Sequence, residues 1–226
     1  VFGWYLKSLE FSDICAPFAL HKFTPYSGQG KMHIARALIE EEMDWEDSEA
    51  LPDIIFRCDM CGGCAVNCIR IMENNPLEVI RALRARAVEK GLAPPEHKRL
   101  YESTIRYGNP LDVPKEERLR WTEGLDFKIK TLPKEHADVL LFTGCQYELE
   151  PTIRNTLKTI AQVLTAGSVD FGFLGADERC CGGMQLLMGE RGMFEQLAKD
   201  NIKTFNELGI ETLVTPCSTF DEARRR

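Results

Sequence analysis

The chain has 226 residues, of which 44% are hydrophobic and 28% are charged, as is usual for a globular protein with one large or two small domains. Its formal net charge of −7 argues against a nucleic-acid partner. The apolar runs are too short for a membrane-spanning helix, and the first residues lack the basic start of a signal peptide. The valine start and the final arginines 224–226 indicate cuts through a longer protein.

The first 92 residues are expected to form a small helical domain. Residues 31–43 have the apolar spacing of an amphipathic helix, with Ile34 and Leu38 on one face. A second helix is expected from Leu77 to Val88, because helical spacing continues there until Gly91.

Four cysteines lie within eleven residues between these helices. Their spacing, C-x2-C-x2-C-x3-C, is that of a bacterial-type ferredoxin site for a [4Fe-4S] cluster. Gly62 and Gly63 suit such a loop, because glycine allows positive φ and a close approach of backbone N–H groups. A structural zinc site is the alternative, but zinc usually takes two separated cysteine pairs. The four residues are Cys58, Cys61, Cys64 and Cys68.

The fourth ligand of this cluster has two candidates. In two-cluster ferredoxins the last cysteine of each run binds the other cluster. Cys15 stands where the last cysteine of a first run would be, whereas Tyr5, Ser8 and Phe11 replace the other three. We therefore favour Cys15 as the fourth ligand; the alternative is that Cys68 closes its own cluster.

Residues 93–136 are expected to be a connector. Pro94, Pro95 and Pro110 and the charged run 115–118 argue against a packed core there, although a helix is expected near residues 97–107.

Residues 137–226 show a different pattern. Apolar strands are expected at 137–143, 169–174 and 211–215, with helices at about 150–164 and 189–208 between them. Strands that alternate with helices of this length indicate parallel βαβ units.

Every cysteine in this second half lies at or just after the end of an expected strand. In a parallel sheet these ends share one edge, so we expect the four thiols to converge. Two are adjacent in sequence, which favours a multi-iron cluster over one zinc ion, and Gly182 and Gly183 leave room for sulfide and a substrate. The four are Cys145, Cys180, Cys181 and Cys217.

Thirty-four residues separate Cys145 from Cys180, and thirty-five separate Cys181 from Cys217. This spacing around Cys180-Cys181-Gly182 resembles the cysteine-rich CCG domain of the heterodisulfide reductase family. That family includes iron–sulfur subunits of glycolate, lactate and glycerol-3-phosphate oxidoreductases, and subunits of sulfite-reduction-linked and benzoyl-CoA reductase complexes. A ferredoxin-like domain followed by a CCG domain is similar to the D-type subunit. The resemblance implies an α+β chain: an all-α cluster domain (1–92), a connector (93–136) and a first, truncated α/β CCG domain of βαβαβ order with a parallel sheet (137–226).

The chain departs from the family pattern in two ways. The pattern normally closes with C-x-x-C, whereas Phe220 stands at the last position here. Family members usually carry two CCG domains, which hold noncubane clusters that cleave a disulfide, and this chain ends after one.

We therefore expect an electron-transfer subunit of an oxidoreductase complex, in which a [4Fe-4S] cubane and a second, CCG-domain cluster form a relay. The implied partners are a flavoprotein and a membrane cytochrome or quinone-reactive subunit. Nine cysteines, an odd number clustered like metal ligands, favour the reducing cytoplasm, with membrane association through partners. The alternatives are catalytic disulfide or thiol reduction at a noncubane cluster, and an iron–sulfur or zinc-binding sensor or scaffold. No catalytic residue is indicated.

Overall fold

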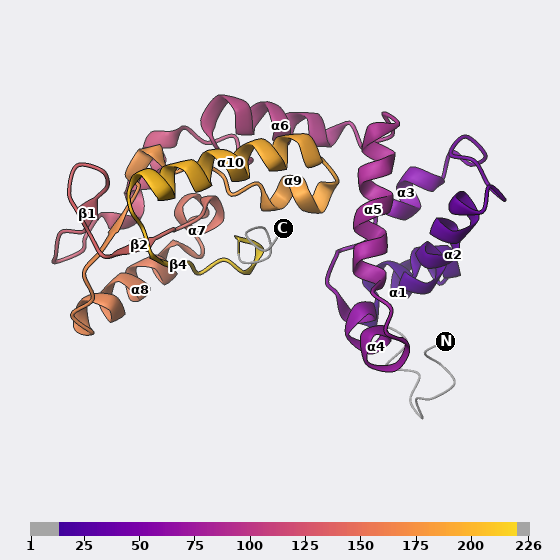
Figure 1. Ribbon diagram of the computed structural model, residues 1–226, viewed down its shortest axis with the longest axis horizontal. Coiled ribbons are helices and arrows are strands. Elements are labelled where there is room, and N and C mark those ends of the chain that lie inside the picture. Colours follow the sequence, from indigo (N-terminus) through magenta and orange to yellow (C-terminus); the bar gives the residue numbers. More distant parts are fainter. Residues whose placement is uncertain (1–13, 221–226) are drawn as a thin grey trace. The chain divides into compact units, whose positions relative to one another are not determined.

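The computed structural model describes residues 14–220, without the side chains at 67 and 70–72. The chain divides into two compact units, residues 1–94 with 187–190 and residues 95–186 with 191–226 (Figure 1). Tyr5, Ser8 and Phe11, which the sequence analysis compared with cluster ligands, lie outside the described residues.

The described part of the first unit is built from helices. α2 and α5 pack against each other, and a small apolar core of Ala35, Leu51, Ile55 and Leu83 lies between α2, α3 and α5. The elements are α1 (Ala16–His21), a 3-10 turn η2 (Thr24–Tyr26), α2 (Gly28–Ile39), α3 (Leu51–Phe56), α4 (Gly63–Met72) and α5 (Pro76–Glu89).

The starts of α2 and α5 follow from their capping residues. The Ser27 hydroxyl accepts a hydrogen bond from the Gly30 N–H, so α2 begins three residues before the expected start. The Asn75 side chain accepts from the backbone N–H of Leu77 and Glu78 at the start of α5. Both helices that the apolar spacing predicted are confirmed.

The second unit contains a four-stranded parallel sheet of order β1-β3-β2-β4. The predicted fold class, α+β with a parallel α/β second half, is confirmed. Strands β2, β3 and β4 fall within the three predicted strand segments. The strands are β1 (Lys130–Thr131), β2 (Val139–Leu141), β3 (Phe171–Phe173) and β4 (Thr212–Val214).

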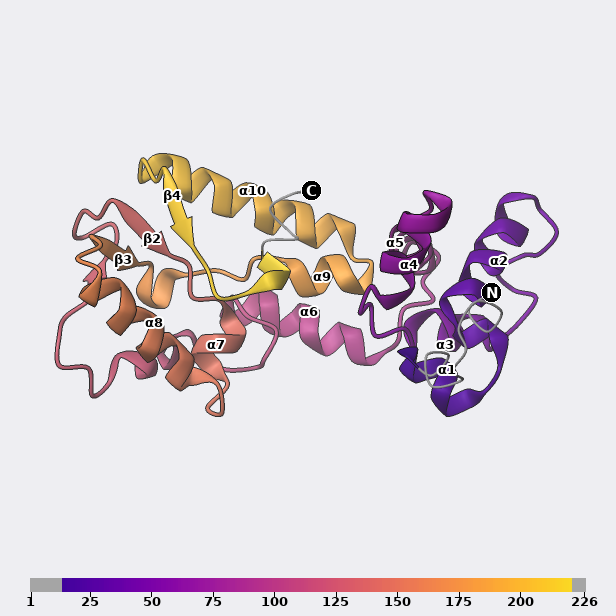
Figure 2. The ribbon, with the colours of Figure 1, turned by 90° about the horizontal axis from the view of Figure 1, so that it is seen from below.

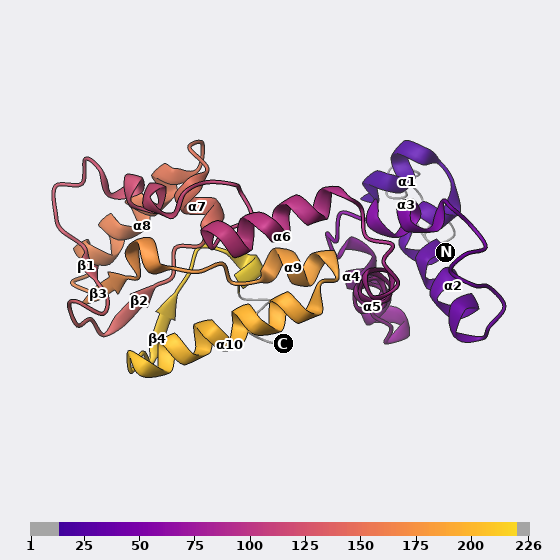
Figure 3. The same cartoon turned by 90° about the horizontal axis from the view of Figure 1, so that it is seen from above.

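Helices cover both faces of the sheet. Leu141 packs with Leu157 and Ala161 of α8 on one face, and Leu140 packs near Phe205 of α10 on the other. Figures 2 and 3 show these two helices on opposite sides of the strands. A strand buried on both faces is apolar throughout, which explains the uninterrupted apolar run at 139–142. The helices are α6 (Glu96–Tyr107), α7 (Cys145–Leu149), α8 (Arg154–Ala166), α9 (Gly183–Met188) and α10 (Arg191–Glu207), with 3-10 segments η3 (Lys115–Thr122) and η4 (Gly175–Asp177).

The segment expected to be an unpacked connector is part of the second unit's core. Trp121 of η3 is fully buried against Phe173 of β3, and Ile129 belongs to the same cluster. Lys130 and Thr131 form the edge strand β1 beside β3. The expectation of no packed core was wrong because Trp121 brings this charged segment onto the sheet. Among residues 14–220, no helix is long and apolar enough to cross a membrane.

Candidate metal centres

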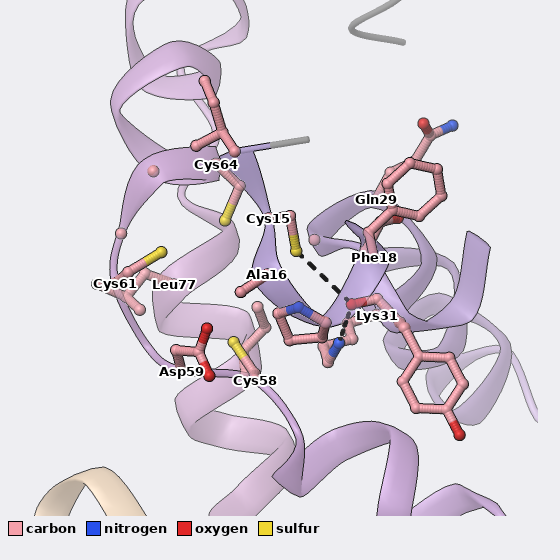
Figure 4. Close-up of a pocket in the computed structure, with 18 of the residues that line it drawn as sticks. Cys15, Ala16, Phe18, Gln29, Lys31, Cys58, Asp59, Cys61, Cys64 and Leu77 are labelled. Carbon is pink, nitrogen blue, oxygen red and sulfur yellow. Dashed lines mark hydrogen bonds between the residues drawn. The ribbon is translucent and has the colours of Figure 1, made fainter. Parts of the chain in front are cut away.

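Four cysteines line one cavity of about 350 Å³ in the first unit (Figure 4). They are Cys15, Cys58, Cys61 and Cys64, and the figure shows their sulfur atoms facing the same space. Cys68 lies farther along α4 and does not line this cavity. Of the five cysteines singled out in this half, the structure thus brings four together.

The backbone around these thiols comes from three places in the chain. Cys15 immediately precedes α1, Cys58 and Cys61 lie in the loop after α3, and Cys64 lies in the first turn of α4. Gly62 adopts φ +75°, as expected of a glycine in such a loop, and Met60 also has positive φ. The Met60 N–H donates to the Cys58 sulfur at 3.4 Å. Such N–H···S bonds tune iron–sulfur clusters.

Gly28, the first residue of α2, lies against the Cys64 side chain. A Cβ atom at position 28 would be 2.8 Å from Cys64 Cβ and 3.0 Å from its sulfur. Only glycine lets the start of α2 approach a cavity thiol this closely. Gly28 is a site residue that the sequence pattern did not predict.

Replacement of Gly28 by alanine is therefore expected to impair cofactor retention in this cavity. The added methyl group displaces Cys64, so we expect G28A to hold less iron and sulfide per chain than the parent protein. Gly63→Ala is a matched control, because its Cβ would be 3.7 Å from the Cys61 sulfur and 3.3 Å from the Ile14 Cγ2 methyl group, farther than the contacts at position 28. Equal iron loss in both variants, measured by metal analysis, would show that the close approach of Gly28 is unimportant.

Two cationic side chains, Lys31 and Arg84, lie near the cavity thiols. Burial raises the pKa of Cys58, and burial together with the neighbouring thiols raises the pKa of Cys64 to about 11. Lys31 of α2 lines the cavity, and burial lowers its pKa, whereas the charges of Cys58 and Cys15 raise it. Arg84 of α5 donates hydrogen bonds to the carbonyls of Cys58 and Phe56. Arg84 therefore fixes the backbone that carries the first thiol of the loop.

The second set of cysteines lies at the carboxyl edge of the parallel sheet. Cys145 follows β2, Cys180 and Cys181 follow β3, and Cys217 follows β4. These three strands are neighbours in the sheet. Cys145 and Cys180 pack together in one buried cluster, and a Cβ atom at Gly144 would be 3.8 Å from Cys217 Cβ. The fold therefore brings cysteines from three strand ends to one place.

A buried ionic network lies behind Cys145. Arg118 of η3 forms an ion pair with Glu148 of α7 and lies 3.7 Å from a carboxylate oxygen of Glu178; all three side chains are fully buried. The Glu178 carboxylate also accepts from the Thr143 and Gly144 N–H groups, at 3.0 and 2.7 Å. This network fixes the turn between β2 and Cys145.

The network acts electrostatically on the thiols. A hydrogen bond with Cys180 and the charge of Arg118 lower the pKa of Cys145 to about 7. Hydrogen bonds with Cys145 and Cys181 raise the pKa of Cys180 well above its usual range. Burial raises the pKa of Glu148 and that of Glu178. Of the two thiols Cys145 and Cys180, Cys145 is thus the one that ionises more readily.

Polar contacts also hold the Cys180–Cys181 turn. The Asn201 amide donates to the Cys180 carbonyl at 3.0 Å, and the N–H groups of Gly182 and Gly183 donate to the two cysteine sulfurs at 3.4 Å. We expected both glycines to leave room for sulfide and substrate. Gly183 instead makes room for Thr219, whose side chain a Cβ atom at 183 would strike.

Phe220 occupies the place in sequence where the family pattern has its last cysteine. Its ring is buried and stacks on Phe142 with centroids 4.5 Å apart. An apolar core contact therefore replaces a potential metal ligand, and four thiols remain at this edge of the sheet.

The spacing of the thiols suits a cluster with several metal atoms. Within residues 14–220, no three cysteine sulfurs lie within 4.8 Å of one another. Sulfurs bound to a single zinc ion, at about 2.3 Å each, would be about 3.8 Å apart. The cysteine thiols of both sets and the sulfur-lined cavity of the first set therefore fit iron–sulfur clusters.

Comparison with known proteins agrees with this chemistry. Residues 139–219 match the family model of the CCG cysteine-rich domain. The chain is 29% identical over 181 residues to the D-type subunit of the dihydromethanophenazine:CoB–CoM heterodisulfide reductase of Methanosarcina mazei, covering 78% of this chain and 42% of that protein. No solved structure matches.

Two other relatives are named as redox proteins. One is the EtfAB:quinone oxidoreductase of Syntrophomonas wolfei, 23% identical over 91% of this chain and 30% of that protein. Another is a probable membrane-anchored ferredoxin of Chromohalobacter salexigens, 28% identical over 72% of this chain and 24% of that protein. The chain thus spans less than half the length of these relatives. Residues 139–219 thus form a CCG cysteine-rich domain, and the chain is similar over most of its length to the D-type reductase subunit.

Proposed function

We propose that this chain is an electron-transfer part of a heterodisulfide-reductase-like complex and that it holds two iron–sulfur clusters. The observation that carries the proposal is the cavity into which four cysteine sulfurs face. When bound, such clusters supply one-electron transfer without group chemistry. The chain's own residues hold the clusters and direct N–H groups and charges at their sulfur atoms.

The first cluster is a [4Fe-4S] cubane. Three ligands come from the loop after α3 and the start of α4, namely Cys58, Cys61 and Cys64. Cys15 supplies the fourth, because it lines the same cavity and Cys68 does not.

The second cluster is bound by the four thiols at the sheet edge. With Phe220 in the core, the described part of this domain offers no fifth cysteine for an elaborated cluster. This favours a relay over direct disulfide cleavage. The ligands are Cys145, Cys180, Cys181 and Cys217.

The partners that we propose are redox subunits. Relatives named as a quinone oxidoreductase and a membrane-anchored ferredoxin suggest a flavoprotein donor on one side and a quinone-reactive or cytochrome subunit on the other. Association with a membrane would then be through these partners.

Iron and acid-labile sulfide analysis of protein purified without oxygen tests the proposal. We expect about eight irons per chain, and about four after the loop ligands Cys58 and Cys61 are both replaced by alanine. Replacement of Cys145 and Cys180 should remove the other set instead. Zinc with no acid-labile sulfide would refute the electron-transfer function.

A further inference from the structure

Lys31 is a buried cation beside the cubane cavity. Its side chain is 1% exposed, although lysine is almost never fully buried without a partner. Its Nζ atom donates a 2.6 Å hydrogen bond to the Tyr26 carbonyl (Figure 4). The Cys15 thiol donates to that same carbonyl at 3.8 Å. Lys31 and a proposed cluster ligand therefore meet at one backbone oxygen.

Among residues 14–220, no aspartate or glutamate forms an ion pair with the Lys31 Nζ atom. The groups that favour its charged form are Cys58, Cys15 and Cys64, three thiols of the same cavity. A buried ammonium group is costly unless an anion lies nearby. A cluster bound by four thiolates is such an anion.

The orientation of α2 adds to this positive field. Its first residues Gly28 and Gln29, together with the capping residue Ser27, line the cavity. The N-terminal end of a helix carries a partial positive charge. Lys31 and the helix end therefore place positive charge at the same wall of the cavity.

We propose that Lys31 raises the reduction potential of the cubane by stabilising its reduced form. The proposal rests on the proposed function, since it needs the cluster to be present. Reduction adds one electron from a donor to the cluster and breaks no bond, so the cluster becomes more negative by one charge. A cation held in the cavity wall, as Lys31 is, stabilises that extra negative charge.

The test is a redox titration of the cluster-loaded protein with dithionite, followed by EPR of the reduced cubane. Lys31→Gln removes the charge but retains a hydrogen-bond donor for the Tyr26 carbonyl. At a fixed potential we expect its ratio of reduced to oxidised cubane to fall at least tenfold, and each tenfold change is about 59 mV for one electron. Arg36→Gln removes a charge from the exposed side of the same helix, and we expect its ratio to stay within twofold.

A fully loaded Lys31→Gln protein with an unchanged midpoint potential would overturn the proposal. If the Lys31→Gln variant does not hold its cluster, the Lys31→Arg variant tests the proposal instead, because it keeps the positive charge and changes the shape of the side chain. A ratio of reduced to oxidised cubane within twofold of the parent ratio supports the charge effect, and a tenfold change of that ratio in Lys31→Arg would refute it. Absence of the cubane EPR signal from the parent protein would refute the proposed function instead.

Discussion

Cys15→Ala is expected to destroy or cripple the cubane, whereas Cys68→Ala is expected to leave it intact. The four sulfurs that face the cavity include Cys15 and exclude Cys68, so only the first change removes a ligand. We expect the iron content of Cys15→Ala to fall by about one to four atoms per chain, with loss of the cubane EPR signal after reduction.

The two variants are matched in chemistry, since each removes one half-buried thiol from the same unit. Their comparison therefore separates loss of a ligand from loss of a cysteine. If Cys68→Ala loses as much iron as Cys15→Ala, or more, then Cys68 is the fourth ligand and the assignment of Cys15 is incorrect.

Arg118→Met is expected to lower the free energy of unfolding by about 3–5 kcal/mol, because removal of one partner from a buried ion pair leaves uncompensated charge in the interior. Arg118 is the cation between Glu148 and Glu178, and all three side chains are fully buried. Urea unfolding under reducing, oxygen-free conditions measures the change.

Two further variants make the reason for this loss testable. Arg120→Met, on the same 3-10 segment, removes a half-exposed arginine and is expected to cost less than about 1 kcal/mol. Glu148→Gln added to Arg118→Met should recover part of the loss, because one buried negative charge is removed. A loss in Arg118→Met no larger than in Arg120→Met would show that the network contributes little to stability.

The sequence predicted those parts of the molecule in which a residue pattern has a single structural cause. The strand β2 was predictable because a strand buried on both faces is apolar at every position. The place of Cys15 beside the loop cysteines was predictable because ligand spacing in a ferredoxin run is regular enough to be counted backwards. The strand ends placed the remaining cysteines at one edge because parallel strands share a direction.

The buried charged residues were not predicted, because charged and polar positions in a sequence normally indicate an exposed surface. Arg118 lies in a run of charged residues that resembles a solvated connector, and only the position of Trp121 turns the segment inward. Lys31 occupies a polar position of an amphipathic helix, and nothing nearby in sequence shows that it faces a cavity. The edge strand β1 has two residues, which is too short for any periodicity.

The position of Cys15 has a mechanical consequence. It precedes α1, whereas the other cavity cysteines follow α3, so a cluster bound by all four would act as a cross-link between distant parts of the chain. A covalent closure of a loop of this length disfavours the unfolded chain by about 4 kcal/mol in the chain-entropy model. The apolar core between α2, α3 and α5 is small, with four buried side chains. Oxidative loss of the cluster would therefore loosen the fold of this unit as well as end its electron transfer.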